Sequence, residues 1–465
     1  MISISIEHIR YVYFVGIGGI GMSAIARWFN TNGKTVAGYD RTPTPLTKAL
    51  EKEGIAIHFE DDVNKIPEAF LQTPQEEVLC VYTPAIPKHH QELNFLQDKG
   101  YNLLKRSEVL GIITKAHFCI GVAGTHGKTT TSSLLAHMLT HAGKNCTGFL
   151  GGIATNYNSN LVLAPNPEEP QLVVVEADEF DRSFLRLHPN ISIVTNAEAD
   201  HLDIYGNEDA VKDSFNAYIR KLDPEEGQLF FQHKVMLAAI EEIKQAYPYG
   251  IDNGAIQAKN IRISDHCFVF NLQLPDRQIK DIPIMVPGFH NVENAVAAAS
   301  VCWQLGLTDE QIRDGIASYK GVKRRFEYIV QQEGKVYIDD YAHHPTELEA
   351  FIQSAKALYP EEKLTVIFQP HLYSRTRDFA DGFAKSLSLA DKVLLMEIYP
   401  ARELPIEGVS ASMIFEQVST EKEMVTEDNL LDKVKADASG IIATVGAGNI
   451  DRFVPQLKAL FEQNA

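Results

Sequence analysis

The chain has 465 residues, of which 45% are hydrophobic and 22% are charged, and at roughly 150 residues per domain this length predicts about three domains. Its formal net charge of −18 argues against broad binding to nucleic acid. We see no signal peptide and no apolar run near the roughly 18 residues of a membrane span, so we expect a cytoplasmic protein without nucleic-acid or membrane partners.

The first segment, residues 1–108, alternates short apolar runs with a helical stretch. The runs predict strands at Tyr11–Val15, Thr35–Tyr39 and Val78–Tyr82, and a helix is expected over Met22–Asn32. Because the helix lies between strands, this segment predicts a Rossmann-like α/β domain with a mostly parallel sheet.

A glycine-rich turn joins the first strand of this segment to its helix. The run Gly16-Ile17-Gly18-Gly19-Ile20-Gly21 matches a diphosphate-binding fingerprint, and Asp40 ends the next strand 19 positions beyond Gly21. Glycines let backbone N–H groups approach a pyrophosphate, and the carboxylate can bind a ribose hydroxyl. Alone, this pattern favours binding of NAD or FAD, with a purely structural turn as the alternative.

The second segment, residues 109–323, contains continuous apolar runs that are typical of a parallel sheet covered on both faces. Short alternating runs between about residues 255 and 287 predict antiparallel strands, and alanine-rich Asn294–Ser300 predicts a helix. The continuous runs predict strands at Phe118–Val122, Leu172–Val175 and Ile191–Val194.

A phosphate-binding loop is predicted where the first of these strands meets a helix, at Gly124-Thr125-His126-Gly127-Lys128-Thr129-Thr130. Val122 stands five positions before Gly127, where the usual pattern has glycine, so this is a shortened variant. The first N–H groups of a helix favour phosphate, Lys128 can reach the terminal phosphate, and the Thr129 hydroxyl can ligate Mg²⁺. The loop therefore predicts an enzyme that uses ATP.

Polar side chains follow the later strands of this segment. Glu176 begins an acidic cluster at a strand end, where it is placed to bind the magnesium of a nucleotide. His201, in the run Asn196–Asp203, is either a ligand of a second metal ion or a structural histidine. Asn291 and Asn294 share one helix face, and they either contact adenine or cap the helix.

The third segment, residues 324–465, again predicts an α/β sheet, with strands at Val336–Ile338, Leu364–Phe368, Val393–Met396 and Ile441–Val445. Its polar clusters lie near the segment start and at two strand ends, where such sheets bind ligands: Arg324-Arg325, Asp339–Pro345 and Gln369–Arg377. The adjacent His343 and His344 have no third close ligand, and the five cysteines have no metal-ligand spacing, so zinc is not predicted. The cysteines are expected to be buried thiols in a reducing cytosol.

Ordered motifs span essentially the whole chain: FVGIGGIGMSAIA from Phe14, GTHGKTTT from Gly124, EADEFDRSF from Glu176, NAEADHLDIYG from Asn196, HNVENAVAA from His290, GVKRRFE from Gly321, DDYAHHPTE from Asp339, FQPHLYSRTRDF from Phe368 and VGAGNI from Val445. In this order they resemble the bacterial Mur ligase family, ATP-dependent amide-forming enzymes of peptidoglycan assembly. The resemblance implies three α/β domains: a Rossmann-like UDP-sugar-binding domain at residues 1–108, a P-loop ATPase-like domain at 109–323, and a Rossmann-like acceptor-binding domain at 324–465.

The resemblance implies that the first glycine turn binds uridine diphosphate instead of a dinucleotide. It also implies roles for the residues at positions that match the family's motifs. The implied UDP-sugar ligands are Gly16, Gly18, Gly19, Gly21, Met22, Ser23, Asp40, Thr83 and Arg106. The implied ATP ligands are Gly124, Thr125, His126, Gly127, Lys128, Thr129, Thr130, Asn291, Asn294 and Arg325. The implied metal ligands are Thr129, Glu176 and His201, and the implied catalytic residues are Lys128, Glu176, His201, Arg325 and Asp340. The implied acceptor ligands are His343, His344, His371 and Arg375.

The implied reaction joins L-alanine to the lactyl carboxylate of UDP-N-acetylmuramate through an acyl phosphate made from ATP. ATP with two Mg²⁺ or Mn²⁺ ions is the implied cofactor set, and the protein is expected to be a monomer or a homodimer. Three alternatives stay open: a related ligase that attaches a preformed peptide to the same UDP sugar, an NAD-dependent oxidoreductase, and a non-catalytic nucleotide-binding protein.

Overall fold

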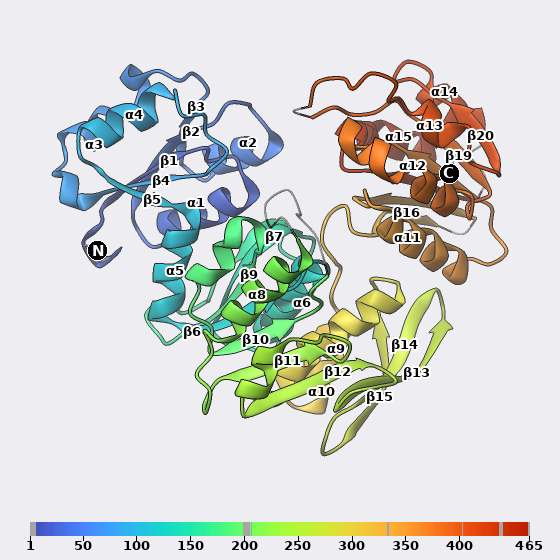
Figure 1. Cartoon of the computed structure of the whole chain (residues 1–465), viewed down its shortest axis with the longest axis horizontal. Coiled ribbons are helices and arrows are strands. Elements are labelled where there is room, and N and C mark those ends of the chain that lie inside the picture. Colours follow the sequence, from blue (N-terminus) through green and yellow to red (C-terminus); the bar gives the residue numbers. More distant parts are fainter. Residues whose placement is uncertain are drawn as a thin grey trace. The chain divides into compact units, whose positions relative to one another are not determined.

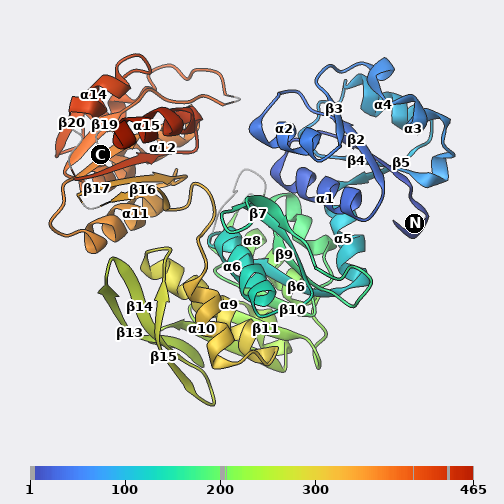
Figure 2. The same ribbon diagram turned by 180° about the vertical axis from the view of Figure 1, so that it is seen from behind.

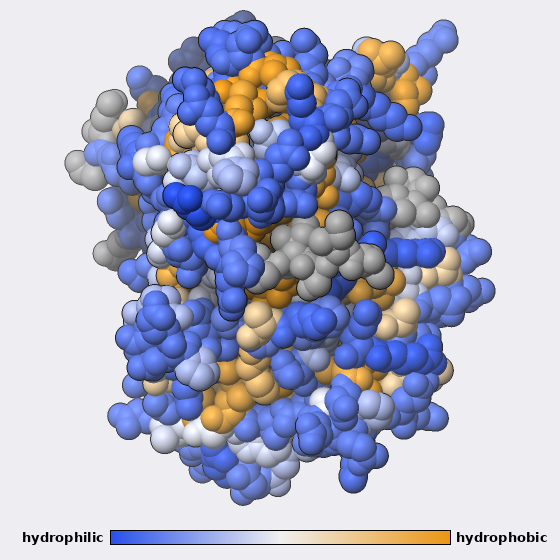
Figure 3. All heavy atoms as spheres, turned by 90° about the vertical axis from the view of Figure 1, so that its left-hand side faces the viewer, coloured by the Kyte–Doolittle hydropathy of each residue, from blue (hydrophilic) through white to orange (hydrophobic). Residues whose placement is uncertain are grey.

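The computed structural model describes residues 6–198, 205, 207–332, 334–401, 403–436 and 440–463. The chain forms two compact units, of which the first comprises residues 1–259, 272–279 and 294–316, and the second comprises the rest. The face shown in Figure 3 is mostly hydrophilic, with hydrophobic residues visible between polar ones. None of the helices that the structure describes is long and apolar enough to cross a membrane.

The first sheet consists of five parallel strands, β1 (Tyr11–Val15), β2 (Thr35–Tyr39), β3 (Ala56–His58), β4 (Val78–Tyr82) and β5 (Asn102–Lys105). Its helices are α1 (Ile20–Thr31), α2 (Pro45–Lys52), α3 (Glu68–Gln72), α4 (Gln91–Asp98) and α5 (Arg106–Ala116) (Figure 1). Alternation along β1 packs Phe14 against Phe29 of α1 and Tyr13 against Phe70 of α3. The strand order β3-β2-β1-β4-β5 reverses at β1, so the glycine turn after β1 lies at a switch point, where open α/β sheets bind ligands.

The second sheet has ten strands in the order β15-β14-β13-β12-β11-β10-β6-β9-β7-β8. The strands are β6 (Phe118–Ala123), β7 (Cys146–Ala154), β8 (Ser159–Val162), β9 (Leu172–Ala177), β10 (Ile191–Val194), β11 (Gln228–Gln232), β12 (Gln245–Ile251), β13 (Ile256–Ser264), β14 (Cys267–Gln273) and β15 (Gln278–Ile284). The helices that follow these strands are α6 (Lys128–His141), α8 (Glu208–Ile219), α9 (Phe289–Gln304) and α10 (Asp309–Ala317).

The centre of this sheet positions the phosphate loop. β6 pairs in parallel with β10 on one side and with β9 on the other, so the loop after β6 lies at a second switch point. α6 packs against β7 and β9 (Figure 2). The alternating runs after residue 255 form β13, β14 and β15, and a two-residue turn joins β13 to β14. Asp265 and His266 have φ of 51° and 56° there, as a hairpin turn of type I′ requires.

The third sheet has the order β16-β17-β21-β18-β19-β20, with β16 antiparallel to β17 and the other pairs parallel. The strands are β16 (Glu327–Gln332), β17 (Lys335–Asp340), β18 (Leu364–Phe368), β19 (Lys392–Leu395), β20 (Glu421–Met424) and β21 (Gly440–Val445). The helices are α11 (Pro345–Leu358), α12 (Tyr373–Leu387), α13 (Ser412–Phe415), α14 (Leu430–Ala436) and α15 (Val454–Gln463). Three mostly parallel sheets with helices confirm the predicted α/β class, whereas the domain boundaries at residues 108 and 323 stay predictions.

Candidate active site

A neighbouring asparagine, Asn196, fixes the conformation of the predicted phosphate loop. Oδ1 of Asn196 accepts from the Thr125 hydroxyl at 2.7 Å and from the His126 N–H at 2.9 Å. Gly124 and Gly127 have φ of 141° and 82°, a region that favours glycine. Among the described residues, no side chain caps α6, and its first turn contains no acid. The start of α6 is therefore suited to a phosphate group.

The ammonium group of Lys128 is paired inside the protein. Nζ lies 2.9 Å from Oε1 and 2.8 Å from Oε2 of Glu179, and it donates to the carbonyls of Gly124 at 2.6 Å and Thr125 at 3.2 Å. The Glu179 side chain is only 2% exposed; burial raises the pKa of its carboxyl, and the charge of Lys128 opposes that rise. We did not predict this partner, although Glu179 ends the same acidic cluster that contains Glu176.

The predicted metal ligands are only partly within the described residues. Glu176 lies in β9, and its Oε2 accepts from the Gly151 N–H at 3.1 Å. Thr129 follows Lys128 in the first turn of α6, whereas His201 lies outside the residues that the structure describes. Within the described ranges, no three His, Cys, Asp or Glu side chains gather into a metal-binding group. A hydroxyl and a carboxylate are nevertheless hard oxygen donors of the kind that Mg²⁺ prefers.

The two predicted adenine ligands differ in their surroundings. Nδ2 of Asn291 donates to the Pro287 carbonyl at 2.7 Å, so this side chain binds backbone near the start of α9. Asn294 is 8% exposed and lies against the phosphate loop, because a Cβ on Gly127 would be 2.7 Å from its Oδ1. Asn294 therefore lies beside the predicted phosphate loop, and the adenine role of both residues stays a prediction.

Asp40 and Thr83 lie against the glycine turn after β1. Oδ2 of Asp40 accepts from the Gly18 N–H at 2.7 Å, and Oδ1 accepts from the Thr42 N–H at 3.2 Å. Gly16 has a φ of 92°, and a Cβ there would lie 2.7 Å from Cγ2 of Thr83. Asp40 therefore fixes the conformation of the turn in addition to any contact with a ligand.

Three other predicted UDP-sugar ligands lie at the start of α1 or next to it. Met22 and Ser23 are 2% and 0% exposed, so their side chains point into the protein. Arg106 covers the turn, because a Cβ on Gly21 would lie 2.7 Å from Nη1, and Nη2 is 3.4 Å from Oδ2 of Asp178. This ion pair connects the glycine turn to the acidic cluster after β9.

In the second unit, Asp340 ends β17 and organises the chain around Arg325. Its carboxylate accepts from the N–H groups of Phe326 at 2.6 Å and Ala342 at 2.7 Å. Burial raises the pKa of Asp340 to about 6, although the charge of Arg325 opposes this shift. The Arg325 guanidinium lies 5.4 Å from the centre of the Tyr341 ring.

Glu347 connects Arg325 with the predicted acceptor ligand His343. Oε1 of Glu347 is 3.9 Å from Nη1 of Arg325, and Oε2 accepts from the His343 N–H at 3.0 Å. Glu347 lies on α11, directly after the loop that carries His343 and His344, and we did not predict its role. The His344 ring contacts Phe379 at 4.8 Å between centroids.

His371 and Arg375 form a second polar pair at the end of β18. Nη1 of Arg375 is 3.4 Å from Nδ1 of His371, whose ring stacks on Tyr399 at 5.9 Å. Burial and the neighbouring Arg375 lower the pKa of His371 to about 4, so this imidazole is neutral at pH 7. The predicted acceptor ligands thus lie after the carboxyl ends of β17 and β18, which both pair with β21.

Family models match nearly the whole chain in three consecutive parts. Residues 11–118 match the model described as "Mur ligase family, catalytic domain", residues 122–302 match "Mur ligase middle domain", and residues 324–448 match "Mur ligase, glutamate ligase domain". The chain belongs to the Mur ligase family. The resemblance predicted from the ordered motifs is therefore confirmed.

Individual Mur ligases are similar to this chain over its full length. A UDP-N-acetylmuramate–L-alanine ligase of Cytophaga hutchinsonii is 46% identical over 463 residues, covering 99% of this chain and 98% of the relative. The crystal structure of the UDP-N-acetylmuramate–alanine ligase MurC from Thermotoga maritima is 29% identical and has a TM-score of 0.82, covering 98% and 100% of the two chains. The crystal structure of a murein peptide ligase from Psychrobacter arcticus is 23% identical and has a TM-score of 0.67, covering 97% of this chain and 98% of the other. At this identity the likeness is evidence for a shared fold only.

Proposed function

We propose that this Mur ligase joins L-alanine to the lactyl carboxylate of UDP-N-acetylmuramate, using ATP, in the synthesis of peptidoglycan precursors. One observation carries the proposal: the first unit holds a diphosphate-type glycine turn and an ATP-type phosphate loop, connected through Arg106 and Asp178. A nicotinamide oxidoreductase would need the first loop and leave the second unused. The UDP-N-acetylmuramate–L-alanine ligase of Cytophaga hutchinsonii, 46% identical over nearly the whole chain, favours the same reaction.

The chemistry requires a carboxylate to become an acyl donor. Transfer of the terminal phosphoryl group of ATP to the lactyl carboxylate gives an acyl phosphate and ADP. The amine of L-alanine then attacks the acyl carbon, and a tetrahedral intermediate expels phosphate as the amide forms. Lys128 would stabilise negative charge on the transferring group, because its ammonium lies at the start of α6 where that group binds.

Metal binding fits the residues of the first unit. Thr129 and Glu176 are the described residues that would hold Mg²⁺ bound with the nucleotide, and His201 is a proposed further ligand. The ion would supply charge neutralisation for the phosphate groups. The chain itself contributes the orientation of these ligands, since the Gly151 N–H fixes one oxygen of Glu176.

The second unit would bind the acceptor. Arg325 and Asp340 are proposed to act near the nucleotide phosphates, and His343, His344, His371 and Arg375 near L-alanine. A neutral His371 beside the cationic Arg375 suits recognition of a carboxylate, because the guanidinium supplies the positive charge. We also propose a cytoplasmic location, which is supported by five free thiols, four of them buried.

A coupled assay tests the proposal against its rivals. ADP formation that requires both UDP-N-acetylmuramate and L-alanine supports the ligase. An absorbance change of added NAD(P)H without ADP formation would favour the oxidoreductase, and nucleotide binding without turnover would favour a non-catalytic protein.

A further inference from the structure

An asparagine of the second sheet forms hydrogen bonds with the glycine turn that follows β1 in the first sheet. Asn160, the second residue of β8, is fully buried. Its Nδ2 donates to the Ile20 carbonyl at 2.5 Å and to Oγ of Ser23 at 2.8 Å, across 140 and 137 positions of sequence. Ile20 lies inside the Gly16–Gly21 fingerprint, so a side chain from the ATP-binding region contacts the UDP-sugar turn directly.

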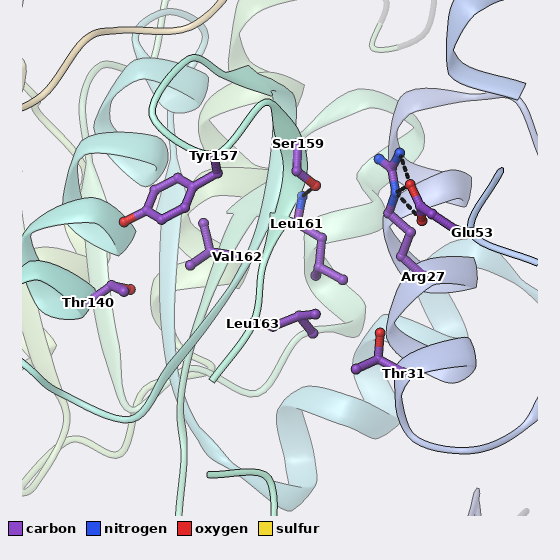
Figure 4. Close-up of a pocket in the computed structure, with 9 residues that line it drawn as sticks. All are labelled: Arg27, Thr31, Glu53, Thr140, Tyr157, Ser159, Leu161, Val162 and Leu163. Atoms are coloured by element: carbon purple, nitrogen blue, oxygen red, sulfur yellow. Dashed lines mark hydrogen bonds and ion pairs between the residues drawn. The ribbon is translucent and has the colours of Figure 1, made fainter. Parts of the chain in front are cut away.

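The other side of the same amide is fixed by an arginine of α1. Oδ1 of Asn160 accepts from Nη1 of Arg27, and the Arg27 guanidinium forms a two-point ion pair with Glu53, at 2.9 Å and 2.7 Å. Figure 4 shows Arg27 of α1 paired with Glu53, across the pocket from Ser159 and Leu161. Every polar atom of the Asn160 side chain is therefore engaged, and the amide can occupy only one orientation.

The hairpin that carries Asn160 also contacts the metal-binding side of the site. β8 pairs with β7, and the Gly151 N–H of β7 donates to Oε2 of Glu176. A short stretch of chain thus contacts the UDP-sugar turn at one point and a proposed Mg²⁺ ligand at another. A shift of the hairpin relative to α1 would change the separation between the two substrate sites.

We propose that Asn160 is a positioning residue, which sets the glycine turn at the distance from the phosphate loop that phosphoryl transfer to the lactyl carboxylate requires. This inference rests on the proposed function. Asn160 touches neither substrate and acts through Ile20 and Ser23. Its loss would leave the turn free to move, and displacements near 1 Å in a reacting pair cost on the order of 100-fold in rate.

The test compares Asn160→Asp and Asn160→Ala with Asn145→Ala in the full-length enzyme. Asn160→Asp keeps the size and the acceptor for Arg27, but replaces the donor to the Ile20 carbonyl with a repelling oxygen. Asn145 is the control: it directly precedes β7, and its amide binds the backbone of Asn166, the carbonyl at 2.8 Å and the N–H at 3.1 Å, instead of the glycine turn. Ser23→Ala removes only one contact of Asn160 and serves as a milder variant that should fold.

The proposal predicts that both Asn160 variants raise KM for UDP-N-acetylmuramate and lower kcat, each about 10-fold or more, with KM for ATP unchanged within about twofold. Ser23→Ala should change the same constants in the same direction by a smaller factor. Asn145→Ala should lower the melting temperature without changing any of these constants. A change in KM for the UDP sugar without a change in KM for ATP indicates positioning. A purely structural role would instead lower the fraction of active enzyme and leave both KM values unchanged.

Two results would overturn the inference. Normal KM and kcat in a folded Asn160→Asp enzyme would do so, as would equal changes in the KM values for ATP and the UDP sugar. If both Asn160 variants fail to fold, unchanged constants in Ser23→Ala would decide against it. Failure of the proposed function is seen separately, as a wild-type enzyme that neither binds nor converts UDP-N-acetylmuramate.

Discussion

Nζ of Lys128 lies 2.8 Å from Oε2 of Glu179, so the lysine that is expected to bind the terminal phosphate already has an anionic partner within the protein. The two side chains are 12% and 2% exposed, respectively. A nucleotide phosphate would therefore compete with a buried carboxylate for the same ammonium group. ATP affinity and the stability of the first unit should accordingly be linked through this pair.

Replacing Lys128 by alanine should abolish ligation while leaving UDP-sugar binding intact. Lys128 places a positive charge at the start of α6, where phosphate is expected to bind. The conformation of the glycine turn is fixed by other residues, Asp40 and Asn160. We expect kcat to fall by at least roughly 100-fold, as when an electrostatic transition-state partner is removed. Phosphate release and calorimetric binding of UDP-N-acetylmuramate measure the two effects. Lys212→Ala, on the exposed face of α8, is the control, and near-normal turnover in Lys128→Ala would contradict the assignment.

Replacing Glu179 by alanine should destabilise the ligand-free protein and increase the stabilisation by ATP. Removing one member of a buried ion pair costs about 3 kcal/mol, and here roughly 2 kcal/mol, because two carbonyls still accept from Lys128. Bound ATP supplies the missing negative charge. The melting temperature with and without ATP measures the difference, and an equal shift in wild type and variant would contradict competition for Lys128.

Gly127→Ala should impair ATP binding far more than Gly143→Ala. The two glycines have similar φ, 82° and 77°, so both substitutions bear a similar backbone strain of about 1 kcal/mol. Only at Gly127 would the new Cβ lie 2.7 Å from Oδ1 of Asn294, whereas no described atom lies within 4 Å of a Cβ at Gly143. We expect KM for ATP to rise about 10-fold or more in Gly127→Ala alone. Equal KM values in the two variants would show that the loop tolerates a side chain.

The stability of the third sheet should fall as the pH rises toward 8. Burial raises the pKa of Asp339 to about 7, although Arg324 opposes the shift, so the folded protein holds a proton that the unfolded chain has lost. A raised pKa contributes stability that is complete below about pH 4 and is lost as the pH rises through the folded value. The free energy of unfolding of wild type minus that of Asp339→Asn should therefore decrease from pH 5 to pH 8, because the amide does not titrate. Calorimetric unfolding at both values tests this, and a difference that grows with pH would contradict it.

Local patterns in the sequence predicted the inner strands of the first and third sheets well. β1 and β18 begin and end at the predicted residues, because a strand buried on both faces is apolar throughout. Eight of the strands that the structure describes were not predicted: β3, β5, β7, β8, β11, β12, β16 and β20. Glycines at 148, 151 and 152 lower the strand propensity of β7, which is a strand because it pairs with β9.

Long-range partners in the site could not be predicted. Lys128 follows from its loop, yet its pairing with Glu179 spans 51 positions of sequence. Asn160 lies outside every motif identified in the sequence, and its importance depends on contacts with α1. The family resemblance implied a UDP-sugar contact for Ser23, which stays a prediction, and it did not reveal that this side chain is fully buried against Asn160.

The most direct test of the account is phosphate release by the purified protein with ATP, Mg²⁺ and UDP-N-acetylmuramate, in the presence of L-alanine, a tripeptide or no acceptor. The account predicts release that requires both the UDP sugar and L-alanine, together with a product that is heavier than the UDP sugar by one alanine residue. Release that requires the tripeptide, or that proceeds without the UDP sugar, would contradict it.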